Sequence, residues 1–263
     1  MVRPKQAHGL RSKVYGPVLL ALFRRKYIPG GIDPITFTLD EVRAELLASG
    51  LAASNVPDVI YRMRSRTMLP AEIQDAGYRM IEITDRGVYA LVVGSSTLVE
   101  YPEPVGVIDV EDHTPDVVRR LLYSDFANVD EQALLSVLRY NDMFSRFIGF
   151  RVYHFKSHVR GSVKGVGQAE IDDVHVAVEH GYDGPLTIVP VEAKAKHDPI
   201  SRTQVVTQTR YAEHVFPGHP IRPLTVKLFE TGEILFMEFN VTKLPNELRV
   251  VRHAFYRLRV HGK

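Results

Sequence analysis

Four charged residues in the middle of the chain have the types and spacing of a metal-dependent site. Glu170 and Asp172 are two residues apart in one run, and Glu192 and Lys194 are two apart in the next. Strand side chains alternate between faces, so each pair shares a face if its run is a β-strand. If the two strands pair with these faces together, three carboxylates and one amine converge. The sequence therefore predicts a divalent-metal site with an adjacent lysine.

A neighbouring carboxylate leaves one assignment open. Asp173 directly follows Asp172 and would face the opposite side of the strand. We expect Asp172 to be the ligand, with Asp173 as the alternative. The second run, residues 186–191, is mostly apolar, which indicates burial on both faces, and charge at the end of such a strand requires a partner or a purpose. Pro190 within it cannot donate to a β-ladder and indicates a bulge or an unpaired position.

The elements around these residues indicate an α/β (α+β) chain. Residues 169–178 and 186–195 read as strands, and the Gly, Asp and Pro residues between them are typical of a hairpin loop. Asn128 and Glu131 have the spacing of a capping box, which would open an amphipathic helix to about residue 148. Further strands are expected at 150–159, 223–230, 233–240 and 249–260, and further helices at 116–123 and 202–214.

The first third of the chain has a different order of elements. A helix is expected at 14–27, a short strand at 35–37, a helix from Thr38 with Glu41 completing a capping box, a third helix from Ser54 or Asn55 to about 68, and a hairpin at 78–83 and 88–93. Residues 94–115 carry Ser and Pro clusters and are the expected linker. We therefore expect two domains, at 1–94 and 116–263.

The central motif resembles a known family. Asp172, nineteen intervening residues and then Glu192-Ala193-Lys194 resemble the motif of the PD-(D/E)XK nuclease superfamily, which includes type II restriction endonucleases, Holliday-junction resolvases and RecB-like exonucleases. The order of helix, strand, hairpin, strand and helix around the motif agrees, whereas Ile171 stands where the nominal motif has proline. The resemblance covers residues 128–240. It implies a restriction endonuclease-like domain with a central mixed β-sheet flanked by helices.

The resemblance also implies roles for individual residues. Mg²⁺ prefers oxygen ligands and is often held by one or two carboxylates. Asp172 and Glu192, with the Ala193 carbonyl, would hold Mg²⁺, for which Mn²⁺ can substitute, and Lys194 would act beside the attacking water. Glu170 is a second-tier catalytic candidate. Two helices would contribute supporting residues: Glu131 through water, or else as a capping partner, and Gln204, Gln208 and Tyr211, which resemble the glutamine and tyrosine helix of RecB-like members.

Residues 1–94 resemble a winged helix-turn-helix. The resemblance rests on the order helix, strand, helix, helix, hairpin. It implies that Arg62, Arg64 and Arg66 on the third helix enter a DNA major groove, and that Arg86 lies at the tip of the wing. Arginines on a solvated face, or a module for protein contacts, are the alternatives.

Charge is unevenly distributed along the chain although the net charge is +2. Residues 1–32 contain seven Lys and Arg and no acidic residue, and residues 248–263 are likewise basic. Two basic ends suggest a polyanionic partner, with solvated basic faces as the alternative. Near the candidate site, the residues expected to contact DNA are Lys156, His158, Arg160, Lys164, Arg202 and Gln204.

The sequence lacks the features of several other classes of protein. The sequence has no cysteine, which removes disulfides and thiolate metal sites and fits a cytoplasmic protein. We expect no membrane span and no signal peptide, because no apolar stretch has the required length. The histidines lack HExxH spacing, and there is no Walker A sequence.

Together these features predict a Mg²⁺-dependent DNA endonuclease, most closely a type II-like restriction endonuclease cutting double-stranded DNA. A homodimer is expected, because one such site cuts one strand. The alternatives are a repair or recombination nuclease acting on branched or damaged DNA, and a non-catalytic DNA-binding protein with a vestigial nuclease fold.

Overall fold

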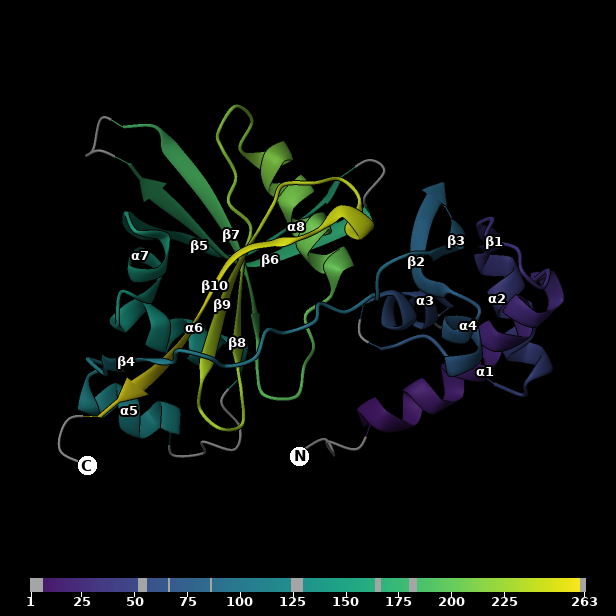
Figure 1. Cartoon of the computed structure of the whole chain (residues 1–263), viewed down its shortest axis with the longest axis horizontal. Coiled ribbons are helices and arrows are strands. Elements are labelled where there is room, and N and C mark those ends of the chain that lie inside the picture. Colours follow the sequence, from purple (N-terminus) through teal and green to yellow (C-terminus); the bar gives the residue numbers. More distant parts are fainter. Residues whose placement is uncertain are drawn as a thin grey trace. The chain divides into compact units, whose positions relative to one another are not determined.

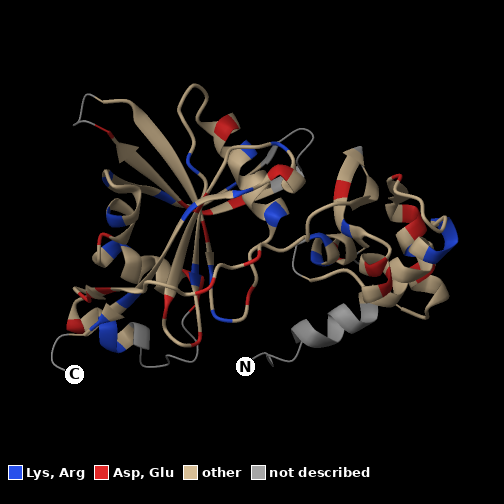
Figure 2. Cartoon of the chain, viewed as in Figure 1, with Lys and Arg blue, Asp and Glu red and all other residues tan. Residues whose placement is uncertain are grey.

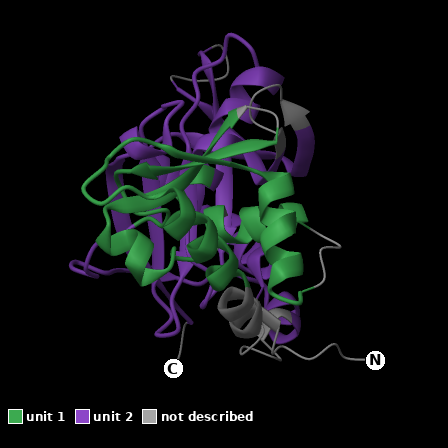
Figure 3. Cartoon of the chain, turned by 90° about the vertical axis from the view of Figure 1, so that its right-hand side faces the viewer, with its two compact units in different colours: residues 1–99, 201–203 green, residues 100–200, 204–263 purple. Residues whose placement is uncertain are grey.

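The chain forms two compact units. The structure, a computed structural model, describes residues 7–51, 56–65, 67–85, 87–123, 130–163, 167–179 and 184–260. Residues 1–99 with 201–203 form unit 1, and residues 100–200 with 204–263 form unit 2 (Figure 3). Within the described ranges, no helix is both long enough and apolar enough to cross a bilayer.

Unit 1 packs helices against a small antiparallel sheet. Its strands have the order β1-β3-β2 in the part of the chain that is described (Figure 1). The core includes Phe23, Leu46, Met63 and Tyr78, each at most 2% exposed. The elements are α1 (Ala7–Lys26), β1 (Ile35–Thr38), α2 (Leu39–Ala48), α3 (Val56–Ser65), α4 (Ala71–Asp75), β2 (Tyr78–Asp85) and β3 (Val88–Val93).

The expected capping box at the start of α2 is present. The Glu41 amide donates to Thr38 Oγ1 at 3.2 Å, and the Thr38 amide donates to Glu41 Oε2 at 2.8 Å. The two bonds satisfy backbone donors that the first turn of a helix leaves unpaired. The third helix ends at Ser65, three residues before the expected end, and its expected N-cap, Ser54 or Asn55, lies outside the described residues. The five-residue helix α4 was not expected.

Unit 2 is a mixed sheet with helices. Across the described residues, seven strands have the order β4-β10-β9-β8-β7-β6-β5. The pairs β7–β8 and β4–β10 are parallel, and the other neighbouring strands are antiparallel. The elements are β4 (Ile108–Glu111), α5 (Asp116–Tyr123), α6 (Glu131–Tyr140), α7 (Met143–Ile148), β5 (Arg151–Val163), β6 (Gly167–Val178), β7 (Leu186–Lys194), α8 (Arg202–Val215), β8 (Leu224–Leu228), β9 (Ile234–Phe239), a 3₁₀ turn (Pro245–Glu247) and β10 (Val250–Arg259).

Helices cover both faces of this sheet. Val189 and Val191 of β7 belong to a core cluster with Leu134 of α6 and Phe147 of α7. Ile188 of the same strand belongs to a second cluster with residues of α8. Because adjacent strand residues point to opposite faces, α6 and α7 lie on one face of β7 and α8 on the other. The doubly covered strand explains its continuous apolar sequence.

The structure corrects the expected helix at 128–148. Two helices, α6 and α7, replace it, because Asp142 adopts a left-handed conformation with φ 49°. The N-cap of α6 is Asp130, whose carboxylate accepts from the Ala133 amide at 2.8 Å. Asn128, the expected cap, lies outside the described residues. Since Asp130 caps the helix, Glu131 is available for another contact.

The segment expected to be a linker, residues 95–115, contains a strand. Residues 108–111 form β4, which pairs in parallel with β10 and places Val110 in the core of unit 2. The boundary between the units falls between residues 99 and 100. A four-residue edge strand with a single buried side chain leaves little periodicity in the sequence, so the composition of the segment indicated a linker.

Gly161 on β5 allows the ring of Tyr211 on α8 to lie against the strand. A Cβ at residue 161 would come 2.8 Å from Tyr211 Cζ, closer than carbon atoms pack. We predict that Gly161→Ala lowers the free energy of unfolding by about 1–3 kcal/mol through overpacking. The measurement is equilibrium denaturation in urea.

Gly16→Ala on α1 is the matched control, because its Cβ would find Pro70 Cγ at an ordinary 3.7 Å. It should leave stability unchanged or raise it by up to about 1 kcal/mol, since glycine is unfavourable within a helix. Equal destabilisation by both substitutions would contradict the close approach of Tyr211 to β5.

Candidate active site

The middle of β6 and the end of β7 bring Asp172, Glu192 and Lys194 together. The antiparallel ladder of β6 and β7 ends at the pair of Asp173 and Val191. Asp172 and Glu192 are the next residue of each strand beyond that pair. Asp172 Oδ2 accepts from the Ala193 amide at 2.9 Å, and Lys194 Nζ lies 2.7 Å from Glu192 Oε1. The Glu192 and Lys194 side chains are 5% and 8% exposed. Two carboxylates and an ammonium group thus meet in a largely dehydrated position.

Glu131 supplies the third carboxylate of this cluster. It is the first residue of α6, and its Oε1 accepts from Lys194 Nζ at 3.0 Å. Lys194 Nζ also donates to the Ala193 carbonyl at 3.0 Å. The contact between Glu131 and the lysine is direct, whereas the resemblance implied a connection through water.

The electrostatics of the cluster are dominated by excess negative charge. Burial acts to lower the pKa of Lys194, but Glu192, Glu131 and Asp172 together outweigh it and raise that pKa above its usual value. Burial, and then the charge of Glu192, raise the pKa of Asp172 to about 7, against the opposing effects of Lys194 and the Ala193 amide. The lysine therefore stays protonated. Ionising Asp172 costs free energy, because its carboxylate is partly buried beside that of Glu192.

Asp173 faces the other side of the sheet and is fully buried. Its carboxylate accepts from Arg139 at 2.8 Å and Ser157 at 2.7 Å, and lies within 3.0 Å of His154 and 2.8 Å of His175. Burial acts to raise the pKa of Asp173, but the hydrogen bonds from its donors lower it to about 2. This carboxylate is already satisfied by four side chains, so the geometry favours Asp172 over Asp173 as a ligand.

Glu170 is engaged elsewhere. Its carboxylate pairs with Arg160 at 2.7 Å and with His158 at 3.4 Å on β5. Burial acts to raise its pKa, but hydrogen bonds from Arg160 and His158 lower it. Among the described residues, Glu131 of α6, and not Glu170 of β6, contacts Lys194. The prediction that Glu170 converges with Asp172, Glu192 and Lys194 therefore differs from the described contacts, in which Glu170 pairs with Arg160 and His158.

The expected phosphate contacts fall into two groups. On β5, Lys156 is exposed and follows a bulge, His158 has a positive φ of 51°, and Arg160 is 67% exposed with its charge matched by Glu170. On α8, Arg202 and Gln204 are half-buried near the start of the helix. Gln208, one turn further on, is 1% exposed, and its amide oxygen and nitrogen have no hydrogen-bond partner among the described residues. Lys164 lies outside the described residues.

In unit 1, Arg62 of α3 is paired, whereas the buried Nε of Arg64 has no hydrogen-bond partner among the described residues. Arg62 Nε lies 2.9 Å from Asp58 on the same helix. Arg64 is packed toward Tyr89 and Glu82, and burial lowers its pKa against the opposing effects of those two side chains. Arg66 and Arg86 lie outside the described residues. Tyr61 is the large exposed hydrophobic side chain on this helix.

Several basic residues near the ends of the described chain are paired. Figure 2 shows acidic residues interspersed with basic ones in both units. On α1, Arg24 pairs with Glu72 and Lys26 with Glu41, each at 2.5 Å. On β10, the partners of Arg252, Arg257 and Arg259 are Glu238, Glu233 and Asp109. These pairs favour the solvated-face alternative for the charges involved.

Sequence reasoning missed Lys227 of β8, which is paired in register with Lys194 and 3% exposed. Its Nζ donates to the carbonyls of Ala195, Lys196 and Asp198 at 2.6, 3.0 and 2.9 Å. A lysine in the middle of the apolar run 224–228 was the available signal, because a buried ammonium group needs partners.

The oxygen atoms available at this site suit a cation that binds only a few protein ligands. Among the described residues, no group of three or more His, Asp or Glu side chains is arranged to hold a metal ion. Asp172, Glu192 and the Ala193 carbonyl are all oxygen donors, and Mg²⁺ commonly takes one or two carboxylates with waters and substrate phosphate. Glu192 and the Ala193 carbonyl also bind the Lys194 ammonium, so a metal ion would share these oxygens with the lysine or displace it.

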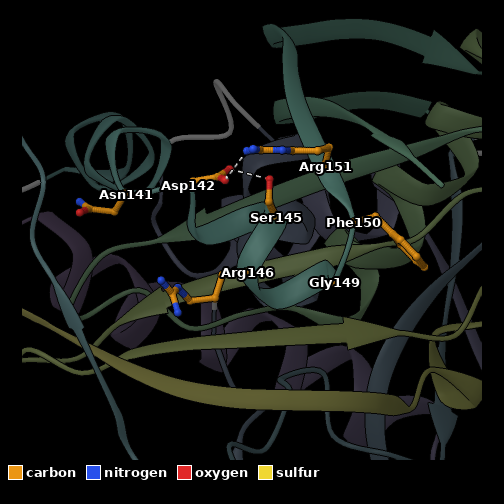
Figure 4. Close-up of a pocket in the computed structure, with 7 residues that line it drawn as sticks. All are labelled: Asn141, Asp142, Ser145, Arg146, Gly149, Phe150 and Arg151. Carbon is orange, nitrogen blue, oxygen red and sulfur yellow. Dashed lines mark hydrogen bonds and ion pairs between the residues drawn. The ribbon is translucent and has the colours of Figure 1, made fainter. Parts of the chain in front are cut away.

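A hollow of about 510 Å³ lies between α7 and the start of β5, away from these residues in sequence (Figure 4). Its lining includes Asp142, Ser145 and Arg151, which hydrogen-bond one another through the Asp142 carboxylate. The hollow contains none of the candidate residues of the metal site.

Comparison with known proteins gives no match to a family model, to a curated protein or to a solved structure.

The two adjacent aspartates should respond oppositely to removal of their charge. The folded state holds the Asp172 proton more tightly than the unfolded chain, whose carboxyl titrates near 4. Stability is therefore lost as pH rises from about 4 through 7. We predict that Asp172→Asn raises the melting temperature at about pH 8 in the presence of a chelator and changes it little at about pH 4.

Asp173→Asn provides the contrast. Its folded-state pKa lies below the unfolded value, so its contribution is present above about pH 4 and is lost toward pH 2. The substitution leaves Arg139 without its buried counter-charge and should cost about 3 kcal/mol or more at neutral pH. Thermal melts across pH measure both effects, and the same sign for the two variants would contradict the assignment of the faces.

Proposed function

We propose that this protein is a Mg²⁺-dependent DNA endonuclease, and specifically a type II-like restriction endonuclease cutting double-stranded DNA as a homodimer. The observation that carries the proposal is the meeting of Asp172, Glu192 and Lys194 on adjacent strands, with Asp172 held at a pKa of about 7 by burial and Glu192. Buried carboxylates with too few counter-charges favour a divalent cation, and perturbed groups of this kind are candidates for catalysis.

The proposed chemistry assigns each side chain a task. Bound Mg²⁺ would neutralise charge on the phosphate and activate water, with Asp172, Glu192 and the Ala193 carbonyl as ligands. Lys194 is protonated, so it would orient the attacking water and stabilise the negative charge that develops on the phosphate, rather than remove a proton. Glu131 holds the lysine in place through its 3.0 Å contact.

The surrounding elements support the resemblance to PD-(D/E)XK nucleases. A mixed sheet with helices on both faces carries the motif in the middle of β6 and at the end of β7, and α8 follows with Gln204, Gln208 and Tyr211. Unit 1 has the element order of a winged helix-turn-helix, with the additional helix α4 before its hairpin. We propose that it contacts DNA through α3 and the hairpin. A pair of subunits would place one such site on each DNA strand.

One observation favours the alternative of a nuclease acting on branched or damaged DNA. Tyr153 and Phe155 of edge strand β5 are 44% and 58% exposed, close in sequence to the exposed Lys156. Exposed aromatic rings beside cations suit unpaired bases, which stack on them. Digestion of a linear duplex and a four-way junction separates the two functions: discrete duplex fragments support restriction, and cutting confined to the junction supports the alternative.

The purified protein should cleave DNA when Mg²⁺ is present and stop when the metal is chelated. We predict that Asp172→Ala, Glu192→Ala and Lys194→Ala each reduce the cleavage rate by about a hundredfold or more, the usual effect of removing a group that stabilises the transition state. Glu72→Gln, which breaks a surface pair in unit 1, is the control and should cleave normally. Absence of Mg²⁺-dependent cleavage by the unmodified protein, or normal cleavage by the three variants, would overturn the mechanism.

The requirement for metal should depend on pH. Below about pH 7 the Asp172 carboxyl is protonated and is a poor ligand, so the Mg²⁺ concentration that gives half-maximal cleavage should fall as pH rises through 7. In Asp173→Asn, if it folds, the same dependence should persist because Asp172 is unchanged. A half-saturating concentration that is constant between about pH 6 and 8 would argue against Asp172 as a ligand.

A further inference from the structure

Lys227 is a buried lysine that the chemistry above does not use. It lies on β8, directly beside Lys194 of β7 in the parallel register, and is 3% exposed. Its ammonium group has three hydrogens, and it donates to three backbone carbonyls, those of Ala195, Lys196 and Asp198. In the described residues no salt bridge includes Lys227, so its hydrogen-bond partners are neutral carbonyl oxygens rather than carboxylates.

The three carbonyls belong to the segment that leaves the candidate site. Residues 195–198 connect Lys194, the last residue of β7, with α8, which begins at Arg202. The segment is folded back on itself by a hydrogen bond from the Asp198 amide to the Ala195 carbonyl at 3.1 Å. Just beyond it, the Ile200 amide donates to the hydroxyl of Tyr101 at 2.9 Å. Lys227 thus donates three hydrogen bonds to this segment, and the contact of His197 with Glu230 at 3.1 Å is a further one that holds it.

The two neighbouring lysines have different environments and therefore different tasks. Lys194 is surrounded by carboxylates, whereas Lys227 is surrounded by carbonyl oxygens of the chain that follows Lys194. Hydrogen bonds from charged donors are about twice as strong as neutral ones, so three of them on one short segment fix its path strongly.

We propose that Lys227 is a positioning residue of the candidate active site, which fixes residues 195–198 and thereby the end of β7 that carries Ala193 and Lys194. Its effect on catalysis rests on the proposed nuclease function, whereas its effect on the segment does not. Lys227 has no role in the reaction itself, because its ammonium hydrogens are all directed to the backbone.

Hydrogen–deuterium exchange tests the effect on the segment. Lys227→Met keeps a long side chain and removes the three donors. Exchange in a peptide covering residues 195–200 should accelerate by about tenfold or more, since hydrogen bonds to charged groups are worth a factor of that size. Thr225→Val is the matched control: Thr225 is fully buried two residues away on the same strand, and its hydroxyl has no partner among the described residues. It should leave exchange in this peptide unchanged.

Equal exchange in Lys227→Met and the unmodified protein would overturn the proposal, as would equal acceleration by Thr225→Val. If Lys227→Met does not fold, Lys227→Gln, which keeps two donor hydrogens, takes its place. It should give a smaller acceleration in the same peptide, and exchange equal to the unmodified protein would again overturn the proposal.

Cleavage of DNA then tests the consequence for catalysis. The Mg²⁺ concentration for half-maximal cleavage is measured at a temperature where thermal melts show both proteins to be fully folded, because a partly unfolded population would itself raise the apparent value. Under that condition it reports on the site itself. We expect Lys227→Met to raise it by about tenfold, a typical effect of disturbing groups that orient metal ligands. If exchange is faster but the half-saturating Mg²⁺ concentration is unchanged, Lys227 fixes residues 195–198 without affecting the candidate active site, and its role at that site is overturned. An unmodified protein without any cleavage would overturn the proposed function and leave the exchange result standing.

Discussion

The buried ammonium of Lys194 is the interaction on which the candidate site depends. It contacts carboxylates from β7 and α6, and the charge of Asp172 on β6 acts on it as well. An isolated buried charge is very costly, and so are two buried carboxylates side by side. Each charge is tolerable because of the others. The ion cluster therefore links the start of α6 to the end of β7 and the middle of β6, and its surplus of negative charge provides the chemistry that we propose.

The adjacent aspartates show how one strand serves two purposes. Asp172 lies on the face of Glu192 and Lys194 with few donors, and its pKa is raised to about 7, whereas Asp173 on the other face has four partners and a pKa near 2. Hydrogen-bond supply separates the two, because Asp173 has the lower pKa although its side chain is the less exposed to water. The satisfied carboxylate ties α6 and β5 to β6, and the unsatisfied one remains available to a cation.

Surface charge gives weaker support to DNA binding than the sequence suggested. Arg62 of α3 and the arginines of β10 have acidic partners within their own unit, and Glu170 neutralises Arg160 beside the site. Exposed ion pairs contribute little to stability, so phosphate could compete for the arginines, but only by displacing these carboxylates. The candidate site itself carries the functional argument, because its geometry does not depend on net charge.

The sequence by itself determined most elements and the central motif, because local patterns express them. Alternation in 169–178, the apolar run before Glu192 and the Thr38–Glu41 capping box all correspond to observed features. Tertiary structure decided the rest. The partners of Glu131, Glu170 and Lys227 depend on strand order and helix placement, which join residues far apart in the chain. The short strand β4 and the break at Asp142 likewise follow from long-range packing and one unusual backbone conformation, and neither leaves a periodic signal in the sequence.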